Sequence, residues 1–399
     1  MNKLKGNLLY GQSGGPTSII NTSAYGLFIE AFNNKNIINK IYDLNYGIQG
    51  LLEEKIIEIK NDSNLKKLLN TPGSFFGSNR FKLGDIKEEI LVYKRILEVF
   101  KNFNIRYFFY NGGNDSMDTI NKIGIFFKNN NYECRLIGIN KTIDNDLVNT
   151  DFSLGYVSAA KFIINSTIEI ALDDLSYQKG RVNIIETMGR NTGWLAASSS
   201  LASVKGLKPD LIYVPEIPFD IETFLKKVKE IYQKKKHCLV VVSEGIKDNE
   251  GNFIYQSTPL LDRFDHNQLG GVAIKLASYI NEKLNYKTRY FELSLLQRAS
   301  SITTSSLEQK IAIELSRFAL ASAIAGESNK IVVINRIKSN PYEYNFSLVP
   351  LKDVANKERK LELKYIDSIN SSINDEFIDY LLPLIDGNDG ILDILEKTK

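Results

Sequence analysis

The sequence predicts an α/β fold with parallel β-sheets and a binding site at the strand ends. Two short, unbroken apolar runs, at 105–110 and 136–140, are typical of buried parallel strands, and the segment 117–128 between them has a helical pattern. Each run is followed at once by a polar cluster, at 111–116 and at 141–146. Because open α/β sheets bind ligands beyond the carboxyl ends of their strands, we expect both clusters to lie in one crevice.

Length and composition narrow the class of protein. A chain of 399 residues is long enough for two domains, and its net charge of +3 gives no strong field for nucleic acid or membrane surfaces. Cys134 and Cys238 lie in apolar runs and are expected to be buried free thiols, which fits a reducing compartment. No secretory pattern or membrane-length apolar run is found, so a cytoplasmic location is expected.

The first polar cluster has the features of an anion site. Gly112 and Gly113 allow close approach of the backbone to a ligand. The amides around Asp115 and Ser116 are expected to begin a helix, and a helix N-terminus attracts anions. The ordinary alternative is a turn, with Asp115 acting only as a helix cap.

The second cluster adds groups that act on a phosphate. Lys141 is a compact cation suited to a phosphate. Of the two carboxylates Asp144 and Asp146, one could take a proton from a hydroxyl and the other could hold Mg²⁺. A solvated loop is the alternative. Together the two clusters indicate phosphoryl transfer, in which positioning and charge stabilisation dominate catalysis.

Two other glycine-rich loops fit the same chemistry. The loop 11–17 follows an expected strand at 8–10 and precedes an expected helix at 18–32, an arrangement that forms anion cradles. It is not a Walker A loop, because it lacks the Gly-Lys-Ser/Thr sequence. The loop 73–82 ends with Arg80 and Lys82, which suit a diphosphate if they are not simply solvated.

The second half of the chain continues the alternation of strands and helices. Arg190 follows one expected strand, where it can face a bound anion or lie on a helix surface. Glu244 follows another, where it can accept hydrogen bonds from a hydroxylated ligand or cap a helix. Strands are expected at 181–188, 210–215, 237–242, 287–296 and 330–334, the last of them before a tail of unassigned role, and helices at 158–172, 221–234 and from 272.

The motifs 112–116 and 141–146 resemble those of the phosphofructokinases, and of their pyrophosphate-dependent branch in particular. The resemblance covers about residues 8–335 and implies two similar doubly wound α/β lobes with the active site in the crevice between them. It implies that 1–157 with 297–347 form the lobe for the phosphoryl donor. Residues 158–296 with 348–399 would form the lobe for fructose 6-phosphate.

The resemblance also implies a reaction and roles for named residues. A phosphoryl group would pass from pyrophosphate to the 1-hydroxyl of fructose 6-phosphate, with Asp144 as general base and Mg²⁺ held by Asp146 and Asn114. Lys141, Thr142 and Arg190 would stabilise the transferring group. The substrate-binding residues would be Gly14, Gly15, Arg80, Lys82, Asp115, Ser116, Arg181, Met188, Gly189, Glu244, Arg289 and Arg298.

In the family, Arg181 and Arg289 match arginines that serve the neighbouring subunit's sugar phosphate. The resemblance therefore implies a homodimer or homotetramer with shared active sites. Asn114 departs from the pattern, because the family often has an aspartate there that helps to hold Mg²⁺. An amide oxygen can still bind a metal or its water, but with less charge.

Three alternatives remain open. ATP-dependent members have glycine where this chain has Asp115 and Lys141, so these two side chains argue for pyrophosphate as donor. A non-catalytic regulatory subunit is disfavoured by Asp144 and Arg190. A kinase acting on NAD or lipid is disfavoured by the sugar-site residues Glu244 and Arg298.

Overall fold

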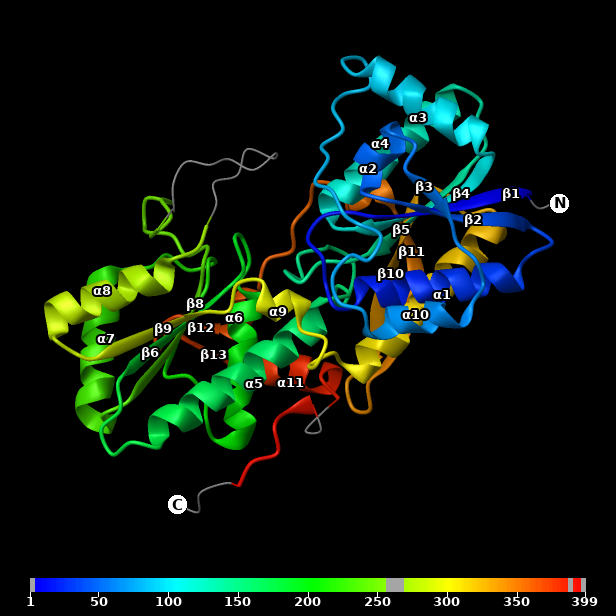
Figure 1. Ribbon diagram of the computed structural model, residues 1–399. Coiled ribbons are helices and arrows are strands. Elements are labelled where there is room, and N and C mark those ends of the chain that lie inside the picture. The colour runs from blue at the N-terminus through cyan, green and yellow to red at the C-terminus, as the bar shows by residue number, and fades with distance from the viewer. Residues whose placement is uncertain (1–3, 256–268, 387–389, 396–399) are drawn as a thin grey trace.

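Two β-sheets, one in each of two lobes, organise the computed structural model, which describes residues 4–255, 269–386 and 390–395 (Figure 1). The first sheet has seven strands in the order β11-β10-β5-β4-β1-β2-β3, and the second has four in the order β7-β8-β6-β9. The predicted α/β class is confirmed, although the two lobes are built on sheets of unequal size. A separate ribbon pairs β12 (Ile366–Asp367) with β13 (Ser372–Ile373).

The first sheet is parallel except at its two edges. Its central strands run parallel, whereas β3 and β11 pair antiparallel with their neighbours. The chain winds from β1 to β2 on one side and from β4 to β5 on the other, so the direction of winding reverses beside β1. The strands are β1 (Gly6–Gln12), β2 (Ile38–Leu44), β3 (Ile56–Glu58), β4 (Ile105–Gly112), β5 (Arg135–Asn140), β10 (Lys330–Lys338) and β11 (Glu343–Pro350).

The second sheet is wholly parallel. Its strands β6 and β8 are paired along their full length, and they end side by side at Thr187 and Ser243. The strands are β6 (Val182–Thr187), β7 (Leu211–Tyr213), β8 (Cys238–Ser243) and β9 (Thr288–Glu292).

Helices cover both sheets, which explains why the central strands are apolar on both faces. In β4, Tyr107 and Phe109 belong to the core beneath α1 and α10, whereas Phe108 and Tyr110 belong to the core beneath α3 and α4. The helices are α1 (Ile20–Asn33), α2 (Gly47–Leu52), α3 (Ile90–Asn102), α4 (Asn114–Asn129), α5 (Tyr156–Leu175), α6 (Trp194–Ser198), α7 (Ile221–Lys235), α8 (Val272–Leu284), α9 (Leu296–Ala299), α10 (Ser306–Ile324) and α11 (Asp375–Leu381).

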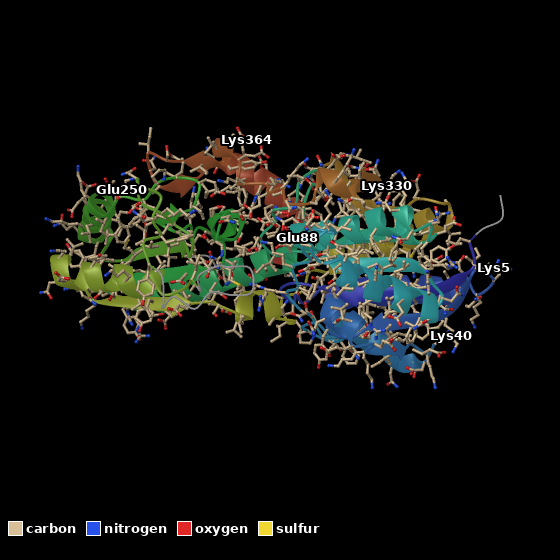
Figure 2. The ribbon with its side chains drawn as sticks, turned by 90° about the horizontal axis from the view of Figure 1, so that it is seen from above. Lys5, Lys40, Glu88, Glu250, Lys330 and Lys364 are labelled. Carbon is tan, nitrogen blue, oxygen red and sulfur yellow. The ribbon has the colours of Figure 1, made fainter. Side chains whose placement is uncertain are left out.

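The two lobes share one hydrophobic core. Ile139 of the first sheet, Ile163 of α5 and Val241 of the second sheet all belong to it. Seen from above, the lobes lie side by side, and charged side chains such as Lys40 and Glu250 are exposed (Figure 2). The two lobes are therefore joined by buried apolar side chains.

Two strand predictions misplace the end of the strand by four residues. The strand predicted at 287–296 ends at Glu292, because Ser294 has a positive φ of 40° and the short helix α9 follows. Gln297 and Arg298 thus lie on a helix and not at a strand end. The strand predicted at 330–334 continues to Lys338 and is not the last, since β11 pairs with it antiparallel.

Two further findings concern the chain as a whole. Cys134 and Cys238 are free and buried, as predicted. Among the described residues, no helix is long and apolar enough to cross a membrane.

Candidate active site

Three neighbouring strands of the first sheet deliver the predicted loops to one edge. Gln12 ends β1, Gly112 ends β4 and Asn140 ends β5, and these strands lie next to one another in the sheet. The glycine-rich loop 13–17 and the cluster 141–146 therefore lie on either side of the start of α4. The sequence places them together because each follows a buried parallel strand.

The second lobe presents its loops to the same space. Met188 follows β6 and Glu244 follows β8, whose ends are paired. A cavity of about 850 Å³ is lined by residues of both lobes. The lining includes fourteen of the predicted site residues: Gly14, Gly15, Arg80, Asn114, Asp115, Ser116, Lys141, Thr142, Asp144, Asp146, Met188, Arg190, Glu244 and Arg298.

Four predicted residues do not line the cavity. Lys82 is one of them. Gly189 lies behind the surface and donates its backbone N–H to Glu244 Oε1 at 3.3 Å. Arg181 precedes β6, and Arg289 is paired with the second residue of that strand. Both arginines therefore lie at the amino end of the second sheet, opposite to the edge that faces the cavity.

Two glycines let cations approach the first loop closely. Gly14 has a φ of +77°, and a Cβ there would lie 3.2 Å from Lys141 Nζ. At Gly15 a Cβ would lie only 2.8 Å from an Arg298 guanidinium nitrogen. Side chains at these positions would occupy the space where backbone and cations meet. Glycine therefore leaves room for both cations, and at Gly14 the positive φ also favours it.

Lys141 is a buried cation and not a solvated surface lysine. Its side chain is 3% exposed, and Nζ donates a hydrogen bond to the Gly15 carbonyl oxygen at 2.8 Å. Burial and the nearby charge of Arg298 lower the pKa of Lys141 to about 7. Asp144 and Asp146 offset only part of this effect, so a bound anion would stabilise the charged form and Lys141 is suited to a phosphate.

The acids of the cavity have raised pKa values. Burial raises the pKa of Asp144, and burial with the nearby Asp144 raises the pKa of Asp146 to about 7. Burial and Asp144 likewise raise the pKa of Glu244 to about 7. Asp146 and Glu244 can therefore exchange protons near neutral pH, and the raised pKa of Asp144 favours its protonated form.

The loop that carries the two aspartates is held by local hydrogen bonds. The Asp144 N–H donates to Thr142 Oγ1 at 3.1 Å, and Thr192 Oγ1 donates to the Asp144 carbonyl oxygen at 3.0 Å. One Asp146 carboxylate oxygen, Oδ1, is buried without a hydrogen-bond partner among the described residues. This oxygen is placed to meet a ligand group or a cation.

Sequence reasoning missed several lining residues. Thr192 and Asn191 follow Arg190 directly, so the site loop could have been extended from the sequence. Glu358 also lines the cavity, although it comes from the tail beyond β11. No pattern around Glu358 indicated this position, because tertiary packing alone returns the tail to the site.

The chain matches known proteins along most of its length. A family model described as phosphofructokinase matches residues 7–338. A pyrophosphate--fructose 6-phosphate 1-phosphotransferase of Halomonas elongata is 39% identical, over 96% of this chain and 92% of the relative. A sulfofructose kinase of Alkalicoccus urumqiensis is 31% identical, over 90% of this chain and 91% of the relative. The crystal structure of a pyrophosphate-dependent phosphofructokinase from Marinobacter aquaeolei superimposes with a TM-score of 0.85 and 36% identity, covering 95% and 91% of the two chains.

The low pKa of Lys141 predicts a pH-dependent anion affinity. A lysine with a pKa of about 7 loses its charge as the pH rises above that value. Affinity for the probe anion pyrophosphate should then fall, by up to roughly tenfold per pH unit. Isothermal titration calorimetry between pH 6.5 and 8.5 measures the association constant for pyrophosphate.

Lys141→Arg is the matched control, because a guanidinium stays charged over this range. Pyrophosphate itself also ionises over this pH range, and that effect is the same for both proteins. It therefore cancels in the ratio of the wild-type to the Lys141→Arg association constant. A ratio that stays constant with pH would contradict the role of Lys141.

Proposed function

Because the chain belongs to the phosphofructokinase family, we propose that it transfers a phosphoryl group from pyrophosphate to the 1-hydroxyl of fructose 6-phosphate, giving fructose 1,6-bisphosphate and phosphate. The observation that carries this proposal is the cavity between the lobes. It combines the glycine-rich loop, the buried Lys141 and the acids Asp144 and Asp146 with Arg190 and Glu244 of the facing lobe. The reaction is reversible and belongs to glycolysis.

Asp144 is the general base in this proposal. Its raised pKa lets it accept the proton of the sugar hydroxyl as that oxygen attacks the phosphorus atom. Charge on the transferring group is stabilised by Lys141 and Arg190, with Thr142 donating a hydrogen bond. Met188, Glu244 and Arg298 hold the sugar phosphate, and phosphate leaves as the second product.

Two side chains support pyrophosphate as the donor. In this proposal Lys141, buried against Gly15, binds the phosphate that leaves. Asp115 is exposed at the start of α4 and lines the cavity, where it adds bulk and negative charge against a nucleotide. Pyrophosphate needs such a cation because it has no adenosine to anchor it.

The residues present fit Mg²⁺ delivered with the donor. Among the described residues, no group of three or more histidine, cysteine or acidic side chains could hold a metal ion. Mg²⁺ is usually held by one or two carboxylates together with substrate phosphates, and the unpartnered oxygen of Asp146 suits that role. Asn114 is the second candidate ligand, though its Oδ1 accepts the Asp115 N–H at 2.7 Å. Mg²⁺ would neutralise charge on the donor phosphates.

The substrates are small molecules, and a homodimer or homotetramer would complete each site. Arg181 and Arg289 lie away from their own cavity, and Arg289 is exposed on the edge strand β9. A second copy could receive both arginines at its sugar-phosphate site.

The two buried free thiols fit the proposed cytoplasmic location.

A donor comparison with purified protein tests the proposed function. We expect kcat/KM with pyrophosphate to exceed that with ATP strongly. Asp115→Gly should open some use of ATP, because bulk and charge are removed. Asp115→Gly with Lys141→Gly should in addition weaken the use of pyrophosphate, because the buried cation is lost.

Wild-type protein that prefers ATP would overturn the donor assignment and leave a phosphofructokinase of the other kind. Protein without turnover on either donor would indicate the regulatory-subunit alternative. Lys352→Ala, an exposed lysine outside the cavity, controls for unspecific loss of charge.

Replacement of the base should affect turnover more than binding. We expect Asp144→Ser to lower kcat by roughly 10²–10⁴-fold, the usual contribution of general base catalysis. Steady-state kinetics give kcat, and calorimetry shows whether fructose 6-phosphate still binds. A variant with near wild-type kcat would exclude Asp144 as the base.

Mixed oligomers test the shared site. Arg289→Ala and Asp144→Ser should each be inactive alone, because each lacks one part of every site. Subunit exchange should restore activity, since some sites would combine an intact Asp144 with an intact Arg289. If mass spectrometry shows hybrid oligomers and no activity returns, the two residues act within one chain.

A further inference from the structure

The tail crosses between the lobes beside the active site. The chain after β11, orange in Figure 1, leaves the first lobe and reaches the second. We name residues 357–361 the tail segment. Its Lys357 carbonyl oxygen accepts a hydrogen bond from Asn114 Nδ2 at 3.4 Å, and its Leu361 N–H donates to Glu216 Oε1 at 2.9 Å. The same Glu216 oxygen accepts the Gly193 N–H at 2.9 Å, so the segment contacts loops of both lobes.

Arg359 holds the loop that carries the two aspartates. Its backbone N–H donates to the Asp146 carbonyl oxygen at 2.7 Å. Its guanidinium Nη1 donates to the carbonyl oxygens of Thr150 and Asp151, at 2.9 and 2.7 Å. One residue thus fixes the loop 144–151 at three backbone oxygens.

The same side chain reaches the loop of the facing lobe. The Arg359 guanidinium carbon lies 4.3 Å from the centre of the Trp194 ring, and Trp194 is fully buried at the start of α6. Glu358, which directly precedes Arg359 in the chain, lines the cavity and accepts a hydrogen bond from Asn191 Nδ2 at 2.9 Å. Asn191 directly follows Arg190, so the tail segment contacts both catalytic loops.

We propose that Arg359 is a positioning residue for phosphoryl transfer, which fixes the loop of Asp144 and Asp146 against the loop of Arg190, with Glu358 as a second attachment. This inference rests on the proposed function for the roles of those residues. A planar guanidinium can donate to two carbonyls while it stacks on an indole ring, whereas a lysine ammonium is a compact charge without a planar face for stacking. The tail segment therefore positions the two catalytic loops and is not only a structural connection.

The consequence is a loss of turnover with donor binding preserved. The donor phosphates are assigned to the loop 13–15, Arg80 and Lys141, and none of these has a contact with the tail segment among those described above. The proposed Mg²⁺ ligands Asn114 and Asp146 do contact it, so the kinetics are measured at saturating Mg²⁺. A displacement of about 1 Å between reacting groups can cost about 100-fold in rate. We expect Arg359→Lys to lower kcat by about 10- to 100-fold and to change KM for pyrophosphate by less than about threefold.

Glu358 provides variants that leave the core intact, because its side chain is exposed. Glu358→Gln keeps an oxygen that can accept the Asn191 hydrogen bond, whereas Glu358→Ala does not. We expect the alanine variant to lose several-fold in kcat and the glutamine variant to recover most of that loss. In a double-mutant cycle, Glu358→Ala and Asn191→Ala should be non-additive in kcat, because both remove one contact.

The test measures kcat, KM for pyrophosphate and the midpoint temperature of thermal unfolding for each variant. Lys352→Ala is the control. A purely structural role would lower the midpoint of Arg359→Lys and leave kcat per folded enzyme unchanged, which would overturn the proposal. If Arg359→Lys does not fold, equal kcat for Glu358→Ala and wild type would overturn it as well. If wild-type protein uses another donor, the proposed donor fails, while the ratio of variant to wild-type kcat with that donor still tests Arg359.

Discussion

One buried carboxylate fixes the helix that joins the two lobes. Glu308 of α10 is fully buried, and it accepts the backbone N–H groups of Gly155, Val157 and Ser158 at 2.7, 3.2 and 2.9 Å. These donors belong to the first turn of α5, where the helix dipole favours negative charge. Because the loop of the aspartates leads directly into α5, this contact holds the helix that follows that loop against α10.

The cavity contains both cationic and acidic side chains that lie close together. Lys141, Arg80 and Arg298 lie near one another, and the pKa of Lys141 is lowered by burial and by both arginines. The acids Asp144 and Asp146 offset only part of this lowering of the Lys141 pKa. The pKa values of both acids are themselves raised. A phosphate donor would complete this arrangement, because it brings negative charge to the cations. Binding and protonation are therefore coupled in this site.

Local sequence predicted the elements best where burial and pattern agreed. The strands β4 and β5, with the helix between them, were predicted because both faces of the sheet demand apolar residues. The pattern failed at 287–296, where the apolar run continues past Glu292 although Leu295 and Leu296 are 57% and 65% exposed. Exposed apolar residues cannot be distinguished from buried ones by their type alone.

The sequence by itself determined the family, the α/β class and the loops that follow β1, β4, β5, β6 and β8, because each polar cluster directly follows a buried strand. Only the tertiary structure decided which of these residues meet. Arg181 and Arg289 lie at the amino end of the second sheet, away from the cavity. Arg359 of the tail contacts the aspartate loop, and Glu358 contacts Asn191. These contacts join residues far apart in the chain through backbone hydrogen bonds and ring stacking, which leave no periodic or local pattern in the sequence.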